Sequence, residues 1–182
     1  MKHIYLTLAL LLFTTNAVAE GDSQYLIGAS FGQFRSDSTL DTLDLTNAYE
    51  GKVGFKEGLG VFALSYSFAE EKESLNDEGS EPTTEQYQSV LFLLEGMTEP
   101  NKFIGSLQAQ LVMGVHGGML FANVNKEEKQ DFQYGLQGGI NFPIGPMFGL
   151  ELVYRYSFTN LTFDNVKIDN IQQLNFGATI AF

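Results

Sequence analysis

Cysteine is absent from this chain of 182 residues, which excludes a disulfide framework and a thiolate metal site. Basic residues are scarce, with 10 Lys and Arg against 22 Asp and Glu and a net charge of −12. Proteins that bind nucleic acid need basic patches, so we expect no nucleic-acid partner. Tryptophan is also absent and there are only four prolines, whereas the chain has 19 glycines, 16 phenylalanines and 8 tyrosines. Beyond residue 19, no apolar run approaches the roughly 20 residues of a transmembrane helix.

The first 19 residues have the anatomy of a secretory signal peptide. Lys2 and His3 give a cationic start, an apolar run covers residues 4–13, and Ala17 and Ala19 form a cleavage pattern of small residues. A membrane-anchoring helix is the alternative, but the apolar run is too short to span a bilayer. We therefore predict a signal peptide over residues 1–19 and one mature domain over residues 20–182. An exported chain without a spanning helix is either soluble in the periplasm or spans the membrane as a closed barrel.

Residues 172–182 alternate apolar with small or polar side chains without interruption, which is typical of a β-strand. A last strand that ends on an aromatic residue looks like the closing strand of a bacterial outer-membrane β-barrel. One face of this segment is therefore interpreted as a signal for barrel assembly, carried by Phe182, Ile180, Ala178 and Phe176. The opposite face holds only small and polar residues.

Seven further segments show the same period of two, and each has an apolar face and a polar or small face. They cover residues 25–34, 48–55, 59–68, 86–96, 103–116, 132–142 and 148–158. The fourth segment is ambiguous, because residues 90–94 are all apolar. We predict that Val90, Phe92 and Leu94 face outward, since the other choice would direct Glu95 into lipid at a cost of up to a few kcal/mol.

The connections between these segments alternate in length. The connections at residues 56–58, 98–102 and 143–146 are short, whereas those at 35–47, 69–85, 117–131 and 159–170 are long and polar. This alternation is typical of outer-membrane barrels, which have tight periplasmic turns and larger extracellular loops. A soluble barrel also has alternating strands, but the polar face carries too few charges for a water-exposed surface. The sequence therefore predicts an all-β, eight-stranded, antiparallel up-and-down transmembrane β-barrel with both termini in the periplasm.

An eight-stranded barrel has an interior that side chains can fill. Three predicted inward acids face three predicted inward bases: Glu50, Glu95 and Glu151 with Lys52, Lys56 and Arg155. Opposite charges in a low-dielectric interior should pair, which favours a plugged lumen and a structural role for this cluster. A narrow gated pore, whose ion pairs switch partners, is the alternative.

The signal peptide, eight strands, alternating connections and Phe182 together make this chain similar to the small outer-membrane barrels of the OmpA and OmpX type, some of which are labelled porin-like. The resemblance implies an outer-membrane location among lipid and lipopolysaccharide, and assembly by the barrel-assembly machinery. It also implies surface loops that could bind a host or surface ligand. The leading functional hypothesis is a non-enzymatic structural or surface-interaction protein. A narrow passive channel is the second hypothesis, and a lipid A-modifying enzyme is the third.

The sequence offers little for catalysis or cofactor binding. His116 is the only histidine after residue 19, and Gly117 and Gly118 follow it, so the His-x-Ser spacing of barrel-type lipid A deacylases is absent. We expect His116 to be a polar residue at the rim of the lumen. The acidic connection 69–85 matches a calcium loop poorly, because Ser74 stands where aspartate belongs. We predict no enzyme activity, cofactor or metal, and a solvated acidic loop.

Overall fold

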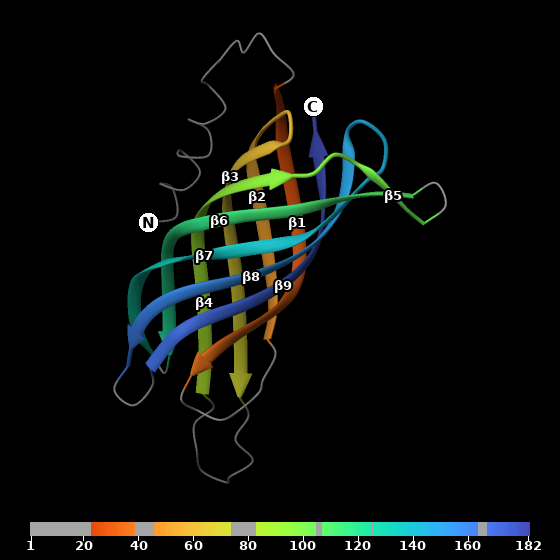
Figure 1. Ribbon diagram of the computed structural model, residues 1–182. Helices are drawn as coiled ribbons and strands as arrows, with labels where there is room; N and C mark the ends of the chain where they lie inside the picture. The colour runs from red at the N-terminus through yellow and green to blue at the C-terminus, as the bar shows by residue number, and fades with distance from the viewer. Residues whose placement is uncertain (1–22, 39–45, 74–82, 105–106, 125, 164–166) are drawn as a thin grey trace.

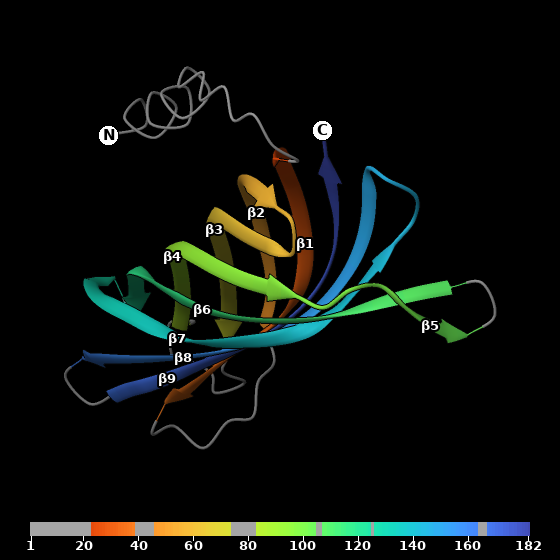
Figure 2. The same ribbon diagram turned by 45° about the horizontal axis from the view of Figure 1, so that its top comes forward.

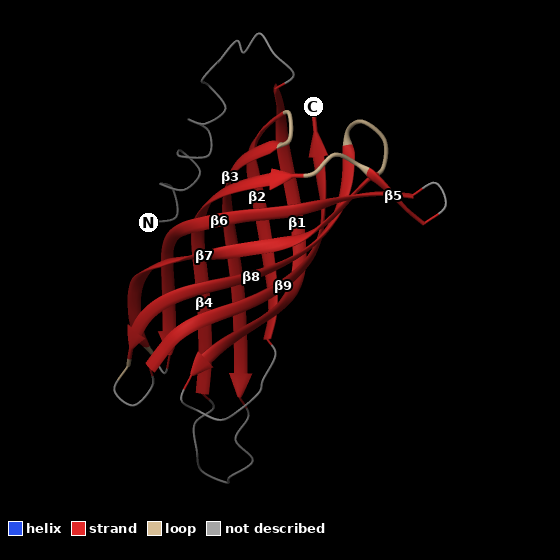
Figure 3. Cartoon of the chain, in the orientation of Figure 1, coloured by secondary structure: helices blue, strands red, loops and turns tan. Residues whose placement is uncertain are grey.

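The computed structural model describes residues 23–38, 46–73, 83–104, 107–124, 126–163 and 167–182, nearly all of them in strands (Figure 3). Among these residues, no helix is long and apolar enough to cross a membrane. The predicted signal peptide lies outside the described residues. The strands are β1 (Ser23–Ser38), β2 (Thr46–Glu57), β3 (Gly60–Glu73), β4 (Thr83–Met97), β5 (Asn101–Ile104), β6 (Leu107–Val124), β7 (Glu127–Pro143), β8 (Phe148–Thr162) and β9 (Lys167–Ala181).

Eight of these strands form a closed antiparallel barrel, as the alternation predicted. Neighbours along the chain pair with one another, β4 pairs with β6, and β1 pairs with β9 to complete the cylinder (Figures 1 and 2). Two backbone hydrogen bonds between Tyr25 and Phe182, both 2.9 Å long, close the β1–β9 junction. A closed barrel satisfies the backbone hydrogen bonds of every strand, which a spanning sheet in lipid requires.

The start of β1 and the end of β9 lie at the same end of the barrel, together with the β2–β3 and β7–β8 turns (Figure 1). We call this the terminal end. At the opposite end, which we call the loop end, β1, β3, β6 and β8 end and β2, β4, β7 and β9 begin (Figure 1). Part of the predicted acidic loop, including the calcium-loop residue Ser74, falls in 74–82 and lies outside the described residues.

The fifth predicted strand is wrong at its start. Phe103 belongs instead to β5, a short strand that pairs only with the first residues of β6 and forms an arm beside the barrel (Figure 2). Thr98 fixes the base of this arm through two hydrogen bonds to Leu111. The backbone N–H of Thr98 donates to the carbonyl oxygen of Leu111 at 3.0 Å, and the hydroxyl oxygen of Thr98 accepts from the backbone N–H of Leu111 at 3.0 Å. Phe103 packs edge-on against Phe142 on the outer surface, with ring centroids 5.8 Å apart.

The predicted faces agree with the exposure of the side chains. Phe92 and Leu94 of β4 are each 58% exposed, while Leu93 and Glu95 are 1% and 3% exposed, so the ambiguous strand has the predicted orientation. Large apolar residues are exposed on the outward face of every barrel strand, including Phe31, Tyr49, Phe62, Met113, Leu136, Leu152 and Phe176. An exposed apolar surface on all sides of a barrel fits a lipid environment and not water.

The amphipathic pattern inverts toward the loop end. On β8 the outward residue changes from Phe158, which is 43% exposed, to the exposed Asn160, while the inward residue changes from Ser157 to the buried Leu161. The inward residues of this region form one buried apolar cluster, the loop-end core: Phe34, Ala48, Ala69, Tyr87, Leu120, Ala122, Val124, Leu161, Phe163, Ile168 and Ile171. The barrel here has the pattern of a water-soluble protein, with an apolar inside and a polar outside.

This inversion explains why two predicted loops are wrong. Residues 117–131 were expected to form a long loop, but β6 continues to Val124 and β7 begins at Glu127. A tight turn joins them, in which Lys126 has a left-handed φ of 68°. Residues 159–170 were also expected to form a loop, but β8 and β9 occupy most of this range. The connections therefore do not alternate strictly between short and long.

Candidate functional site in the barrel lumen

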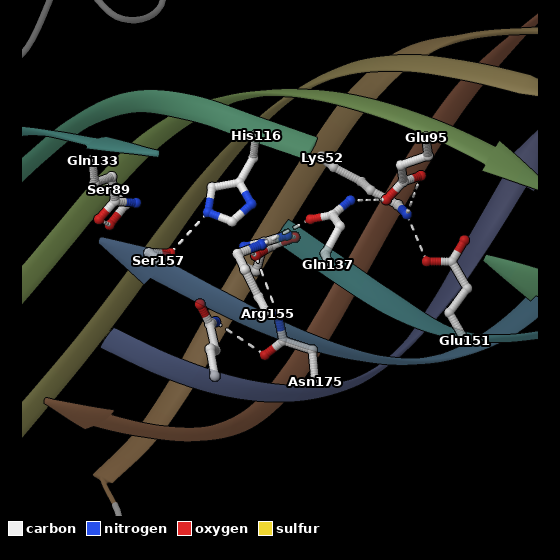
Figure 4. A network of polar contacts seen from close by, with 12 residues as sticks. Lys52, Ser89, Glu95, His116, Gln133, Gln137, Glu151, Arg155, Ser157 and Asn175 are labelled. Carbon is white, nitrogen blue, oxygen red and sulfur yellow. Dashed lines mark hydrogen bonds and ion pairs between the residues drawn. The ribbon is translucent and has the colours of Figure 1, made fainter. Parts of the chain in front are cut away.

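A layer of buried polar side chains crosses the middle of the lumen (Figure 4). Glu50 and Lys52 come from β2, Glu95 from β4, and Glu151 and Arg155 from β8, and all five are at most 8% exposed. Each stands at an inward position of its strand, and the residues directly before and after it in the sequence face outward. The strand period therefore directs five of the six predicted cluster residues into one place.

Arg155 and Glu50 form the central ion pair of this layer. Arg155 donates from Nη1 to Glu50 Oε2 at 2.6 Å and from Nη2 to Glu50 Oε1 at 3.2 Å, which is the two-pronged geometry that a guanidinium makes with a carboxylate. Arg155 Nε donates to Gln137 Oε1 at 3.0 Å, and Asn175 Nδ2 donates to Glu50 Oε2 at 3.3 Å. Both charges are thus held by neutral amides as well as by each other.

Lys52 forms the second ion pair. Its ammonium nitrogen lies 2.5 Å from Glu151 Oε2 and 4.0 Å from Glu95 Oε2. Gln137 joins the two pairs, because it accepts from Arg155 and donates from Nε2 to Glu95 Oε1 at 2.5 Å. The five charged residues therefore form one continuous network through a single amide.

Lys56 does not join this network. It is half-buried near the terminal end of β2, and no ion pair found among the described residues includes it. The buried network therefore contains three carboxylates and two bases. The prediction of three acids balanced by three bases is wrong for this network.

A cavity of about 20 Å³ lies beside Lys52, Glu95, Glu151 and Arg155. Two carboxylate oxygens in this region, Glu95 Oε2 and Glu151 Oε1, are buried without a hydrogen-bond partner among the described residues. A cavity of this size accommodates about one water molecule, and a water bonded to both oxygens would satisfy them.

Two clusters of apolar residues border the polar layer. The loop-end core closes one side. A second buried cluster lines the wall formed by β3, β4 and β6, with a contribution from β1, and its β4 members stand on both sides of Glu95: Leu26, Val61, Ala63, Leu91, Leu93, Met97 and Val112. The ion pairs thus lie beside one apolar wall, and the loop-end core closes the lumen on one side of them.

His116 lies inside the lumen and not at its rim, contrary to expectation. It is 5% exposed, and its Nε2 lies 2.8 Å from the hydroxyl oxygen of Ser157, which is 2% exposed (Figure 4). His116 and Ser157 are on β6 and β8, and the residue between them in register is Gly135 of β7. Sequence reasoning missed this pair because it considered only local His-x-Ser spacing. An inward glycine between two inward polar residues was the available signal.

Glycines connect the main network in the same way. Gly114 of β6 lies in register between Glu95 of β4 and Gln137 of β7. Gly28 of β1 lies beside Lys52 of β2, and a Cβ there would come within 2.9 Å of the lysine side chain. Side chains from strands that are not neighbours can meet because the strand between them presents no side chain.

Three of the four predicted assembly residues lie on the outward face of β9, and Phe182 directly follows the strand with the same parity. Phe182, Ile180 and Phe176 are 54%, 49% and 46% exposed, and Ala178 is half-buried opposite Ala29. Phe176 packs edge-on against Phe31, with ring centroids 5.8 Å apart, across the β1–β9 junction.

A closed barrel with an apolar outer surface and a polar lumen layer defines a transmembrane β-barrel of the outer-membrane class. The sequence matches the family described as outer membrane protein beta-barrel domain over residues 5–182, and the chain belongs to this family. It is an outer-membrane protein. No curated protein sequence gives a significant match.

Solved structures show the same fold at low sequence identity. Neisserial surface protein A is 13% identical, with a TM-score of 0.60 over 88% of this chain and 97% of that one. Outer membrane protein H from Pseudomonas aeruginosa is 18% identical, with a TM-score of 0.52 over 87% and 99%. Ail of Yersinia pestis, in complex with the heparin analogue sucrose octasulfate, is 14% identical, with a TM-score of 0.50 over 88% and 97%.

Proposed function

We propose that this protein is a non-enzymatic structural or surface-interaction protein of the outer membrane, with a plugged lumen. The observation that supports this proposal is the buried network of Glu50, Lys52, Glu95, Glu151 and Arg155, which is bordered by two apolar clusters. Moving an ion through this layer would require the ion pairs to separate inside a low-dielectric interior, at a cost of several kcal/mol per charge. This lumen favours a structural role, in which a rigid barrel presents its loop end to the outside.

The plugged lumen predicts no conductance. We expect the refolded protein to give no single-channel steps in planar lipid bilayers, because the cavity between the ion pairs accommodates only about one water molecule. Heat-modifiable migration on gels, measured on the same preparation, would establish that folded barrels were inserted. Reproducible steps that change size in Glu151→Gln would instead favour the narrow passive channel.

We also propose that the terminal end faces the periplasm and the loop end faces the outside. Barrels of this class have short turns on the periplasmic side, and the β2–β3 connection at the terminal end consists of Gly58 and Leu59. Under the same proposal, residues 1–19 are a removed signal peptide and residues 20–182 are the mature barrel. The protein then lies among outer-membrane lipid and lipopolysaccharide.

The loop end carries an excess of acidic residues. Its described acids are Glu70, Glu85, Glu127, Glu128, Asp131 and Asp169, and Asp77, Glu78 and Glu81 follow in the sequence of the 74–82 connection. Its described bases are Arg35, Lys126, Lys129 and Lys167. Ail was solved with a polyanion, but acidic loops repel polyanions. A host or surface ligand of this protein would therefore be neutral or cationic.

The buried His116–Ser157 pair does not support the hypothesis of a lipid A-modifying enzyme. A serine nucleophile needs a base that is itself oriented by a third group, and it needs access to substrate. The Nδ1 atom of His116 is buried without a hydrogen-bond partner among the described residues, and both side chains are enclosed by the barrel. The pair acts as a polar contact that ties β6 to β8.

We propose that the barrel-assembly machinery reads the outward face of β9. We expect Phe182→Asp to reduce the amount of heat-modifiable barrel in the outer-membrane fraction, because the substitution removes an exposed aromatic residue from that face. Refolding of the purified variant into detergent should change little, since a carboxylate near the membrane interface costs at most about 1 kcal/mol.

The matched control is Phe55→Asp on β2. Phe55 is a similarly exposed aromatic residue near the terminal end, at 45% against 54% for Phe182. Equal losses of folded barrel in the two variants would mean that an aromatic belt, and not a signal on β9, is what assembly requires.

A further inference from the structure

The arm at the terminal end leaves the barrel wall. It consists of β5 and the first three residues of β6, residues 107–109. Because β6 pairs with β4 only from Val112 onward and with β7 only from Gln110 onward, the arm extends past the barrel partners of β6 on both sides. It projects sideways from the barrel in both views (Figures 1 and 2). Closure of the barrel does not require this extension.

One face of the arm is apolar and continues the lipid-facing surface of the barrel. On β6, Leu107 has the same parity as Leu111 and Met113 of the wall, and these three side chains are 40%, 58% and 73% exposed. On β5, Phe103 is 55% exposed, and its contact with Phe142 of β7 places it on the same side. The apolar face of the arm is therefore an extension of a surface that faces lipid.

The opposite face of the arm is polar. Lys102 and Gln108 are paired in register on this face, and both are exposed. Their parity is that of the lumen side of the wall, but the arm encloses no lumen, so these groups face the surroundings. A segment with one apolar and one polar face is suited to lie in the plane of the boundary between lipid and water, as amphipathic helices do. The long side chain of a lysine on the polar face can extend to the headgroups.

The base of the arm is held in a fixed place. Besides the two hydrogen bonds between Thr98 and Leu111, Gln110 Nε2 donates to the carbonyl oxygen of Thr98 at 2.9 Å. The ring contact between Phe103 and Phe142 ties β5 to the outer surface of the barrel. These contacts involve both strands of the arm, so its sideways direction is set by the fold.

The β7–β8 turn extends the apolar surface next to the arm. It directly follows Phe142, and its residues 143–147 include no charged or polar side chain. Ile144 and Met147 in this turn are 51% and 52% exposed. Before the other turn at this end, between β2 and β3, the chain instead carries the charged residues Lys56 and Glu57. The terminal end therefore has an apolar patch on the side of the arm, and such a patch marks a contact with a membrane or a partner.

We propose that the arm and the β7–β8 turn bind the surface of the phospholipid leaflet at the terminal end and anchor the barrel there from outside its wall. Phe103, Leu107, Ile144 and Met147 lie among the upper parts of the acyl chains, and Lys102 lies at the phosphates. The arm stays at the level of the headgroups, because β5 pairs only with β6 among the described residues and its other edge needs water or headgroups to bond. Continuity with the lipid-facing wall favours phospholipid over a protein partner. This surface goes beyond the proposed scaffold function.

The test uses single tryptophans as fluorescent probes, because the chain contains no tryptophan. Phe103→Trp places the probe on the apolar face of the arm, and Gln108→Trp is the matched control on the polar face. Each full-length variant is refolded into phospholipid vesicles whose acyl chains carry bromine near the headgroup or near the middle, and heat-modifiable migration establishes that it is folded. We expect Phe103→Trp to lose most fluorescence with bromine near the headgroup, and Gln108→Trp to lose much less. Phe92→Trp, on the lipid-facing wall, is the positive control for quenching by lipid.

Acrylamide, a quencher dissolved in the water, gives the complementary measurement. It should quench Gln108→Trp strongly and Phe103→Trp weakly. Strong acrylamide quenching of both variants, or equal quenching of both by bromine, would overturn the proposal. Protection of Phe103→Trp from both quenchers would also overturn it, because protein, such as a second copy of this chain, would then cover the arm. The two leaflets of the vesicles are identical, so none of these results bears on which end faces the periplasm or on the conductance test of the plugged lumen.

Discussion

Replacing Arg155 by methionine is expected to destabilise the barrel by about 3–5 kcal/mol, because the substitution leaves a buried carboxylate without its partner. Arg155 is 3% exposed and makes two hydrogen bonds to Glu50 and one to Gln137. Methionine fills much of the arginine volume, so the loss should come from the uncompensated charge and not from a cavity. Urea unfolding of the refolded protein, followed by gel mobility, measures the effect.

The double variant Glu50→Gln/Arg155→Met serves as the control for this effect. Removing both charges should restore most of the lost stability, because buried ion pairs often contribute little net stability compared with neutral residues of similar size. Lys167→Met, which breaks the exposed pair with Asp169, should have little effect, since surface ion pairs are weak. A double variant as unstable as Arg155→Met alone would show that arginine acts by packing and not through Glu50.

The two ion pairs are linked into one network. Arg155 and Lys52 each bind a different carboxylate at close range, and Gln137 links Arg155 to Glu95. Such a connected network fixes the relative register of β2, β4, β7 and β8, because each of these strands supplies at least one charged or amide group to it. The network therefore supports a single rigid barrel, in keeping with a scaffold that presents its outer surface and loops.

The sequence predicted the faces of the strands correctly because lipid imposes one simple constraint on them. An outward charge near the middle of the bilayer is costly, so Glu95 alone was enough to orient the uniformly apolar residues 90–94. The same constraint assigned Glu50, Lys52, Glu151 and Arg155 to the interior. The alternation of side chains along a strand is visible without any knowledge of tertiary contacts. The inward and outward faces of the strands could therefore be predicted from the sequence.

The strand ends could not be read in this way. Beyond the membrane the environments exchange sides, so Leu120, Leu161 and Ile168 face inward while polar residues face outward. A prediction that requires an apolar outward face therefore ends each strand too early, and it assigns these strand ends to loops. The backbone continues as strand because its hydrogen-bond ladder does not depend on which face is apolar.

The contacts within the site were also beyond the sequence, because they depend on strand register. Lys56 has the correct inward parity, but it is half-buried and joins no ion pair found among the described residues. His116 and Ser157 were not paired in advance, because they come together only when β6, β7 and β8 align at Gly135. Parity gives the face of a residue, whereas register gives its height in the barrel.

Gly135→Ala is expected to destabilise the protein by about 3 kcal/mol or more, at the upper end of what overpacking costs. A Cβ on Gly135 would lie 1.9 Å from the carbonyl oxygen of Tyr156 and 2.8 Å from the Cα of Ser157. Both are backbone atoms, so β7 and β8 would have to separate. The same Cβ would lie 2.9 Å from His116 Cε1, so the bond between His116 and Ser157 should also be disturbed. Urea unfolding of the refolded variant gives the loss of stability.

Gly51→Ala is the matched control, because it adds the same methyl group to another barrel strand. Gly51 faces outward on β2, and its Cβ would have no atom within 4 Å. Alanine should be neutral or stabilise by up to about 1 kcal/mol, since glycine within a strand loses more conformational entropy on folding. If Gly135→Ala were as stable as Gly51→Ala, the close approach of β7 and β8 at this row would not be required. The contact between His116 and Ser157 would then need no glycine between them.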